Sequence, residues 1–359
     1  MLSCAVIRSV GARLAAGVDR TFGALALARS KRSRQKSRAE SLGHAERLEA
    51  LGAIRALYDR PEHFTAPDTF FPAPGAPAVA EQRVRRLADG EVVDLRWESG
   101  YAPFADVIAD RYLGTRANHT VYARVLRHEG VPRPAIVLVH GYLGGAFAVE
   151  ERMWPVHWLY ERGLDVVLAV LPFHGLRRGG RMRPQFPSSD PRVTIEGFRQ
   201  AIGDLRALRS YLAARGAPAV GVMGMSLGGY TTALLATVER ELAFAVPVIP
   251  LASIADFARD GGRLVGTDEE QAVQHVALED AFRVVSPLAR PALLPPERML
   301  ILAGEADRIT PIAHAERLAG HLGAPLRKFH GGHLLQLGRA DALRDVARML
   351  ARLGLLAPR

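Results

Sequence analysis

A serine flanked by glycines is the feature of this sequence best suited to covalent chemistry. The segment Gly224–Gly228 carries a glycine two positions before and two positions after Ser226. It follows the apolar run 219–223 and precedes a stretch, 230–237, that favours a helix. In a strand–turn–helix of this kind the serine sits on a tight turn, and the glycines leave room for its hydroxyl to project above the sheet. The pattern predicts a nucleophile elbow with Ser226 as the nucleophile.

The base for this serine is expected near the end of the chain, because a serine hydroxyl is a weak nucleophile until its proton is removed. Two histidines, His330 and His333, follow the short apolar run 326–329. His333 is preceded by two glycines and belongs to the loop after the last expected strand, whereas His330 stands at the end of that strand. His333 is therefore the predicted base, and His330 is the alternative.

A carboxylate is needed to hold the tautomer of the imidazole and to stabilise its cation. After a serine of this type, the acid comes next along the chain and the histidine comes last. The run 299–303 predicts a strand, and Asp307 stands in the turn that follows it. Asp307 is the predicted acid. Glu305 is a local alternative, and Asp256, which follows an earlier expected strand, is a distant one.

An oxyanion hole requires two backbone N–H groups aimed at the developing negative charge. Leu227, directly after the nucleophile, is expected to supply one of them. The other is expected from Tyr142, because it follows His140-Gly141 in the loop after the apolar run 135–139. His140 itself is interpreted as a buried structural histidine.

From about residue 80 onward the chain alternates strands with helices. Two runs, 82–87 and 91–98, predict a hairpin, and residues 119–128 alternate apolar with polar side chains as a half-exposed strand does. The clearest helical periodicity spans 195–214. The alternation indicates an α/β fold with a mostly parallel sheet and helices on both faces. Five continuous apolar runs are typical of parallel strands buried on both sides, namely 135–139, 165–171, 219–223, 244–249 and 299–303.

The positive charge of the chain is concentrated at its N-terminus. Residues 1–40 carry nine Arg or Lys and two acidic residues, hence seven of the ten net positive charges. Because the basicity belongs to a tail, no nucleic-acid partner is expected. Residues 2–28 have the pattern of an amphipathic helix and precede the cluster Arg29–Arg38. This arm is interpreted either as a poorly ordered extension or as a weak contact with anionic membranes.

Residues 1–79 are interpreted as a basic, partly helical extension with a Pro-rich linker, and residues 80–359 as the catalytic domain. The extension includes a helix candidate at 44–60 and a linker or wrapping loop at 61–79, which holds five prolines. None of the candidate catalytic groups lies before residue 80. A chain that starts near residue 41 or 80 is therefore expected to keep its activity on a soluble ester.

Other features of the chain bear on location and cofactors. The single cysteine, Cys4, excludes an intramolecular disulfide, and the N-terminal apolar stretch is interrupted by arginines, unlike a secretory signal. A cytoplasmic location is expected, with the arm as a potential peripheral contact. No paired cysteines or His-Glu-x-x-His motif occur, so neither a metal nor a cofactor is expected.

From about 80 to 355 the chain resembles the α/β-hydrolase superfamily, and more closely its esterase, dienelactone-hydrolase-like and peptidase-like branches. The resemblance implies an eight-stranded sheet and a serine hydrolase that cleaves a small carboxylic ester through an acyl-enzyme. Phe173 stands where the Pro-Gly-His-Gly loop of the family has a glycine. The matching segments, in the family's order, are His140-Gly141, Pro172–Gly175, Gly224–Gly228, Gly304–Asp307 and Gly332-His333.

Several alternatives stay open at the level of sequence. An acyltransferase or a peptidase would use the same residues, and a non-catalytic binding protein could share the scaffold. Residues 251–297, with helices expected at 268–275 and 278–285, are either a small lid or a surface excursion. Four arginines either draw an anionic substrate or belong to a solvated loop; they are Arg177, Arg178, Arg181 and Arg183.

Overall fold

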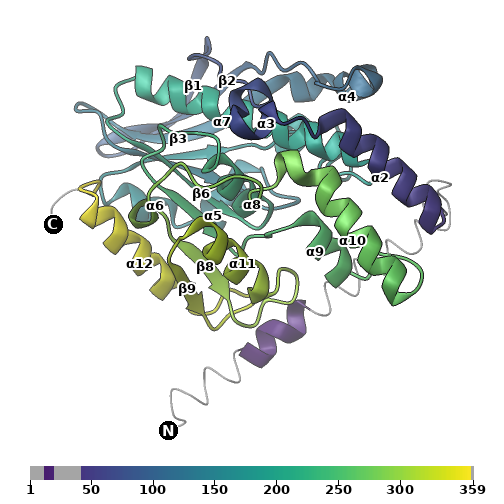
Figure 1. Ribbon diagram of the computed structural model, residues 1–359. Coiled ribbons are helices and arrows are strands. Elements are labelled where there is room, and N and C mark those ends of the chain that lie inside the picture. Colours follow the sequence, from purple (N-terminus) through teal and green to yellow (C-terminus); the bar gives the residue numbers. More distant parts are fainter. Residues whose placement is uncertain (1–11, 20–41, 357–359) are drawn as a thin grey trace, which may run out of the picture.

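A nine-stranded mixed sheet forms the centre of the protein (Figure 1). The computed structural model describes residues 12–19 and 42–356. The strand order is β1-β2-β3-β5-β4-β6-β7-β8-β9. The α/β fold expected from the sequence is confirmed, but the sheet has nine strands rather than eight, because β1 adds an edge strand beside β2. The strands are β1 (Ala80–Arg86), β2 (Gly90–Glu98), β3 (Thr120–His128), β4 (Ala135–Val139), β5 (Asp165–Ala169), β6 (Val220–Met225), β7 (Ala245–Val248), β8 (Ile301–Gly304) and β9 (Leu326–Phe329).

The parallel part of the sheet brings the predicted site residues to one edge. Strands β1, β2, β3 and β5 pair antiparallel, whereas the pairs from β5 through β4 to β9 are parallel. The register sets Val139 opposite Gly224 and Met225 opposite Val248. The carboxyl ends of β4, β6 and β7 therefore align, and the loops that follow them meet above the sheet.

Helices cover both faces of the sheet (Figure 1). One buried cluster contains side chains of α2, α7 and α8, and a second one, on the other face, contains side chains of α6 and α12. The helices are α2 (His44–Tyr58), α3 (Glu62–Thr65), α4 (Ala109–Leu113), α5 (Phe147–Met153), α6 (Val156–Tyr160), α7 (Pro191–Ala214), α8 (Leu227–Leu235), α9 (Ile254–Asp260), α10 (Asp268–Phe282), α11 (Ile312–Leu322) and α12 (Arg339–Arg352).

Capping residues explain where two of the helices differ from the expected ranges. Helix α7 begins four residues earlier than its apolar periodicity, because the Asp190 side chain accepts a hydrogen bond from the Arg192 N–H and Pro191 occupies the first turn. Helix α10 replaces the two short helices expected in the segment 251–297. It starts at a capping box formed by Thr267 and Glu270.

The segment before residue 80 is packed into the larger core. Tyr58, Phe70 and Phe71 are completely buried in the cluster that also contains α7. The Tyr58 hydroxyl donates a hydrogen bond of 2.9 Å to the buried carboxylate of Glu196 on α7. Helix α2 also lies beside α10 (Figure 1), where Arg55 pairs with Asp280 at 2.9 Å. The hydrophobic core thus continues across the domain boundary expected near residue 80.

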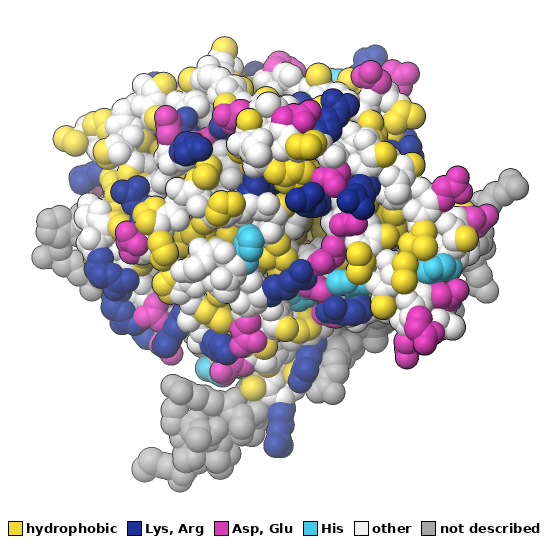
Figure 2. Space-filling view, in the orientation of Figure 1, with side chains coloured by type: hydrophobic (Ala, Val, Ile, Leu, Met, Phe, Trp, Pro, Cys, Tyr) yellow, Lys and Arg dark blue, Asp and Glu magenta, His cyan; other side chains and the backbone are white. Residues whose placement is uncertain are grey.

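The basic arm is described only in part. Residues 12–19 are helical, with Leu14 and Val18 exposed. The rest of the expected amphipathic helix and the cluster Arg29–Arg38 lie outside the described residues. No helix among the described residues has the length and apolar character needed to cross a membrane. On the face shown in Figure 2, acidic and basic side chains are interspersed.

Candidate active site

The Ser226 turn between β6 and α8 is fixed by close backbone contacts. Ser226 has φ 57°, a left-handed conformation that is uncommon outside glycine. A Cβ on Gly224 would lie 2.1 Å from the Gly228 carbonyl oxygen, and a Cβ on Gly228 would lie 2.1 Å from the Val139 carbonyl oxygen. Neither position can hold a side chain, so both glycines of the motif are required. The Ser226 N–H donates to the Val248 carbonyl at 2.9 Å, which ties the turn to β7.

The three predicted side chains form a continuous chain of hydrogen bonds. His333 Nε2 lies 3.0 Å from Ser226 Oγ. His333 Nδ1 lies 2.8 Å from Asp307 Oδ2. Asp307 is almost fully buried, and the imidazole of His333 is largely so. With the proton on Nδ1, Nε2 is free to accept the proton of the serine hydroxyl.

Thr310 also contacts Asp307 and His333, although it was not among the residues expected at the site. Asp307 Oδ1 accepts the N–H groups of Ile309 and Thr310 at 2.9 and 2.8 Å. The Thr310 hydroxyl lies 3.0 Å from Asp307 Oδ2 and 3.0 Å from His333 Nδ1. Both carboxylate oxygens are therefore held by donors. The sequence did carry a signal for this contact, the spacing Asp-x-x-Thr. An aspartate in such a turn accepts hydrogen bonds from the backbone N–H groups two and three residues later.

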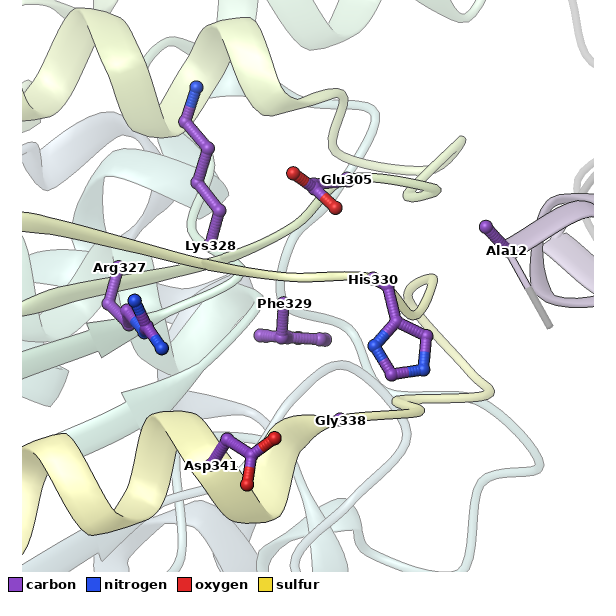
Figure 3. Close-up of a pocket in the computed structure, with 8 residues that line it drawn as sticks. All are labelled: Ala12, Glu305, Arg327, Lys328, Phe329, His330, Gly338 and Asp341. Atoms are coloured by element: carbon purple, nitrogen blue, oxygen red, sulfur yellow. The ribbon is translucent and has the colours of Figure 1, made fainter. Parts of the chain in front are cut away.

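The alternative acids and base lie elsewhere. His330 and Glu305 line a cavity of about 370 Å³ beside Ala12, and Ser226 is not among its lining residues (Figure 3). Asp256 lies on α9, where its carboxylate is 2.9 Å from His275 Nε2 and 2.5 Å from an Arg317 nitrogen. Among the described residues, His333 is thus the base candidate that contacts Ser226, and Asp307 is the acid candidate that contacts His333.

The candidate oxyanion amides lie on two loops that meet at the serine. Leu227 is the first residue of α8. Gly141, which precedes Tyr142, is so close to the serine that a Cβ built on it would lie 3.5 Å from Ser226 Cβ. The role of the Leu227 and Tyr142 amides stays a prediction. The Tyr142 side chain is partly exposed; burial raises the pKa of its phenol, against the lowering effect of Arg183 and Arg263.

His140 lies beneath this loop as a buried histidine. Its Nε2 accepts the Leu171 N–H at 3.1 Å, and its Nδ1 lies 2.8 Å from the Gly141 carbonyl oxygen. The ring of His174 is nearby, at a centroid distance of 5.0 Å. Burial lowers the pKa of both imidazoles, that of His174 strongly. Two neutral rings therefore support the loops after β4 and β5.

Non-glycine residues with positive φ gather at the carboxyl edge of the sheet. Leu143 and Phe173 lie in the loops after β4 and β5, while Ser226 and Ile249 follow β6 and β7. Phe173, at φ 60°, occupies the position where the resembling family has glycine, and its buried ring packs edge-on against Tyr112. Such backbone strain is typical of functional sites.

Arg177 does not face a substrate, contrary to one interpretation of its arginine-rich segment, and it is not solvated, contrary to the other. Its side chain is completely buried and pairs with Asp204 at 2.8 Å. It also donates to the carbonyl oxygens of Val170 and Asn118, both at 3.1 Å. Arg177 therefore holds the loop after β5 against α7. Whether the segment 251–297 serves as a lid stays a prediction.

Comparison with known proteins places these features in context. The profile of the Prolyl oligopeptidase family matches residues 199–335. Two uncharacterized proteins of Mycobacterium tuberculosis, MT2702 and Rv2627c, are each 34% identical over 306 residues, or 82% of this chain and 72% of the relative.

Two solved structures share the fold. Acetyl xylan esterase 1 from a Thermoanaerobacterium species has a TM-score of 0.55 and 15% identity, with 84% of this chain and 98% of that chain covered. An acetyl xylan esterase from a Paenibacillus species has a TM-score of 0.51 and 17% identity, with 83% and 92% covered. At these identities the similarity concerns the fold.

Proposed function

This chain belongs to the α/β-hydrolase superfamily of serine hydrolases, in one family with the two mycobacterial relatives, and from that premise we propose that it hydrolyses a carboxylic ester through an acyl-enzyme on Ser226. The observation that carries the proposal is the hydrogen-bond chain from Ser226 through His333 to Asp307, with distances of 3.0 and 2.8 Å. Its first contact joins a nucleophile to a base, and its second joins the base to the group that orients it.

In the acylation step, Ser226 Oγ attacks the carbonyl carbon of the ester while His333 Nε2 takes the hydroxyl proton. The imidazolium that forms is stabilised by Asp307, which is already held by backbone and hydroxyl donors. The negative charge that develops on the carbonyl oxygen is met by the N–H groups of Leu227 and Tyr142. His333 then gives its proton to the departing alcohol.

In the deacylation step, His333 removes a proton from water, and the resulting hydroxide attacks the acyl carbon. The bond between the acyl carbon and Ser226 Oγ breaks, and Oγ recovers the proton from His333. An acyltransferase would follow the same course with an alcohol or a thiol in the place of water. The difference between hydrolase and transferase therefore lies in the acceptor and not in these three residues.

An ester is proposed as the substrate because, of the acyl compounds considered, it needs the least activation of its carbonyl group and of its leaving group. An alcohol and an amine each take one proton from His333 as they leave, but an amide carbonyl is less electrophilic than an ester carbonyl and an amine leaves with greater difficulty. A peptidase is the second candidate, since the Prolyl oligopeptidase family profile covers 199–335, which contains Ser226, Asp307 and His333. A non-catalytic binding protein is the third.

Initial rates on matched chromogenic substrates test this order. We expect the full chain to hydrolyse 4-nitrophenyl acetate, and to do so much faster than it cleaves a prolyl 4-nitroanilide. Ser226→Ala, which removes only the hydroxyl of the candidate nucleophile, is the control for the background reaction. Faster cleavage of the anilide would favour the peptidase. A new ester formed when a short alcohol is added would favour the acyltransferase. Absence of turnover on both substrates, together with binding of the ester, would favour the binding protein.

A further inference from the structure

The helical residues 12–19 dock beside the loops that carry the acid and the base (Figure 1). Ala15 and Ala16 are buried, and they form a small apolar cluster with Ala306, the residue before the candidate acid. Leu14 and Val18, on the same helix, are exposed. One face of this helix is therefore a contact surface for the loop after β8.

Asp19 lies at the end of this helix, and its carboxylate is buried, with 1% of the residue exposed. Oδ2 accepts the N–H of His333 at 2.7 Å and the N–H of Arg308 at 3.2 Å. Oδ1 accepts the N–H of Leu334 at 3.0 Å. One side chain thus satisfies three backbone donors, which come from the loop of the base and the loop of the acid.

The glycine before the base is explained by the same contact. A Cβ built on Gly332 would lie 2.5 Å from Asp19 Oδ2. A side chain at this position would therefore push the carboxylate off its three donors. The Gly332-His333 pair, singled out from the sequence, has a glycine because Asp19 approaches the backbone there.

We propose that Asp19 is a positioning residue for the reaction, an inference that rests on the proposed function of Ser226 and His333. Its carboxylate joins the backbone at His333 to the backbone at Arg308, next to Asp307. This bridge fixes the separation of base and acid, and it sets the imidazole at hydrogen-bond distance from Ser226. Buried N–H groups need partners, so the donors left by removal of Asp19 would turn toward water and move the loop.

The bridge makes the N-terminal segment part of the active-site architecture, although it supplies no group that touches the substrate. Asp19 acts through the backbone of His333, and its loss should lower kcat and leave KM essentially unchanged. A displacement of about 1 Å in a catalytic group can cost on the order of 100-fold in rate. We expect Asp19→Ala to lower kcat by roughly 10- to 100-fold.

The test measures the rate of fluorophosphonate labelling and kcat in the full chain for Asp19→Ala and Asp19→Asn. Val18→Ala is the matched control, because its side chain is exposed on the same helix. Asp19→Asn should have an intermediate effect, since its amide oxygen can still accept at the Oδ2 position while its NH2 group faces a donor. This variant carries the test if Asp19→Ala does not fold.

Amide hydrogen exchange at Arg308, His333 and Leu334 gives a second readout. Support requires faster exchange at these amides, slower labelling and lower kcat in the Asp19 variants, with Val18→Ala like the wild type. Faster exchange with unchanged labelling and kcat would overturn the positioning role and leave a purely structural contact. If the wild type itself does not react with the probe, the proposed function fails, which is distinct from an effect limited to Asp19.

Discussion

The serine turn and the histidine loop reach the same site by different means. Ser226 is held by neighbours in its own motif, where the two glycines are in such close contact that no side chain fits. His333 is held by Asp19, a residue 314 positions earlier in the chain. The candidate nucleophile is thus positioned by local backbone geometry, whereas the loop of the candidate base contacts a distant segment of the chain.

This difference has a consequence for mutation and for sequence analysis. A motif that builds its own geometry survives changes elsewhere and can be recognised from a few letters. A loop held from a distance can be disabled by a change far outside its motif. Substitutions in the two regions separate these two kinds of support.

The largest effect is expected at the base itself. His333→Ala should lower kcat by about 10⁴-fold, because Ser226 then has no group to accept its proton. His330→Ala is the matched control: it removes an imidazole from the same loop, but from a side chain that lines a separate cavity. Steady-state kinetics on a soluble ester measure both. Comparable losses in the two variants would mean that the loop, and not the imidazole of His333, carries the effect.

The acid should follow closely. Asp307→Asn should lower kcat by about 10⁴-fold, since the amide cannot hold the Nδ1–H tautomer of His333. Asp256→Asn removes a similarly buried carboxylate on α9, which pairs with His275 on α10 and Arg317 on α11. It should leave kcat close to that of the wild type. A severe loss in Asp256→Asn, with Asp307→Asn active, would reverse the assignment.

Removal of the N-terminal segment should have an intermediate effect, which departs from the expectation based on sequence alone. A chain that starts at residue 42 lacks Asp19, so its kcat should fall by roughly 10- to 100-fold, as in Asp19→Ala. A chain that starts at residue 12 retains Asp19 and serves as control. Thermal melts show whether each chain is folded. Full activity in a folded chain that starts at residue 42 would argue that the histidine loop holds itself.

The smallest effect concerns the stability of the fold at acidic pH, which depends on the two buried histidines beneath the loops after β4 and β5. Burial lowers the pKa of His140 and strongly lowers that of His174, so the unfolded chain binds protons that the folded chain does not. The contribution of these two groups to the free energy of unfolding is therefore fully present above the ordinary histidine pKa of about 6.5. It falls as the pH drops below that value, by up to about 1.4 kcal/mol per pH unit for each group.

Urea unfolding at pH 8, 6 and 5 measures this slope. His174→Gln should flatten the profile, because the imidazole whose pKa is lowered strongly by burial is gone, even if the variant is less stable at pH 8. An equal slope in wild type and His174→Gln would exclude His174 as a source of the acid sensitivity.

Local patterns allowed most of the fold, and the three side chains of the candidate site, to be selected from the sequence. The strands recur within a few residues of the expected runs, because continuous apolar stretches mark strands buried on both faces. Ser226, Asp307 and His333 were selected by their place after such strands, and the structure brings these three side chains together.

Other features depend on contacts that no local pattern encodes. Asp19 was missed because its partner His333 lies 314 positions away in the chain. Thr310 stands three residues after Asp307, but its contact with His333 arises only when the two loops meet in the fold. Arg177 was interpreted as a loop cation, whereas its partner Asp204 comes from α7. The membrane contact expected of residues 1–40 stays a prediction, since the cluster Arg29–Arg38 lies outside the described residues.

The most direct test of the central claim is labelling of the full chain by a fluorophosphonate, followed by mass spectrometry of its peptides. Such a probe reacts with a serine whose hydroxyl is activated by a base, without need of the natural substrate. The account predicts one adduct, on Ser226, and none in Ser226→Ala, whose thermal melt should remain close to that of the wild type. An adduct on another residue, or labelling that persists in Ser226→Ala, would contradict it.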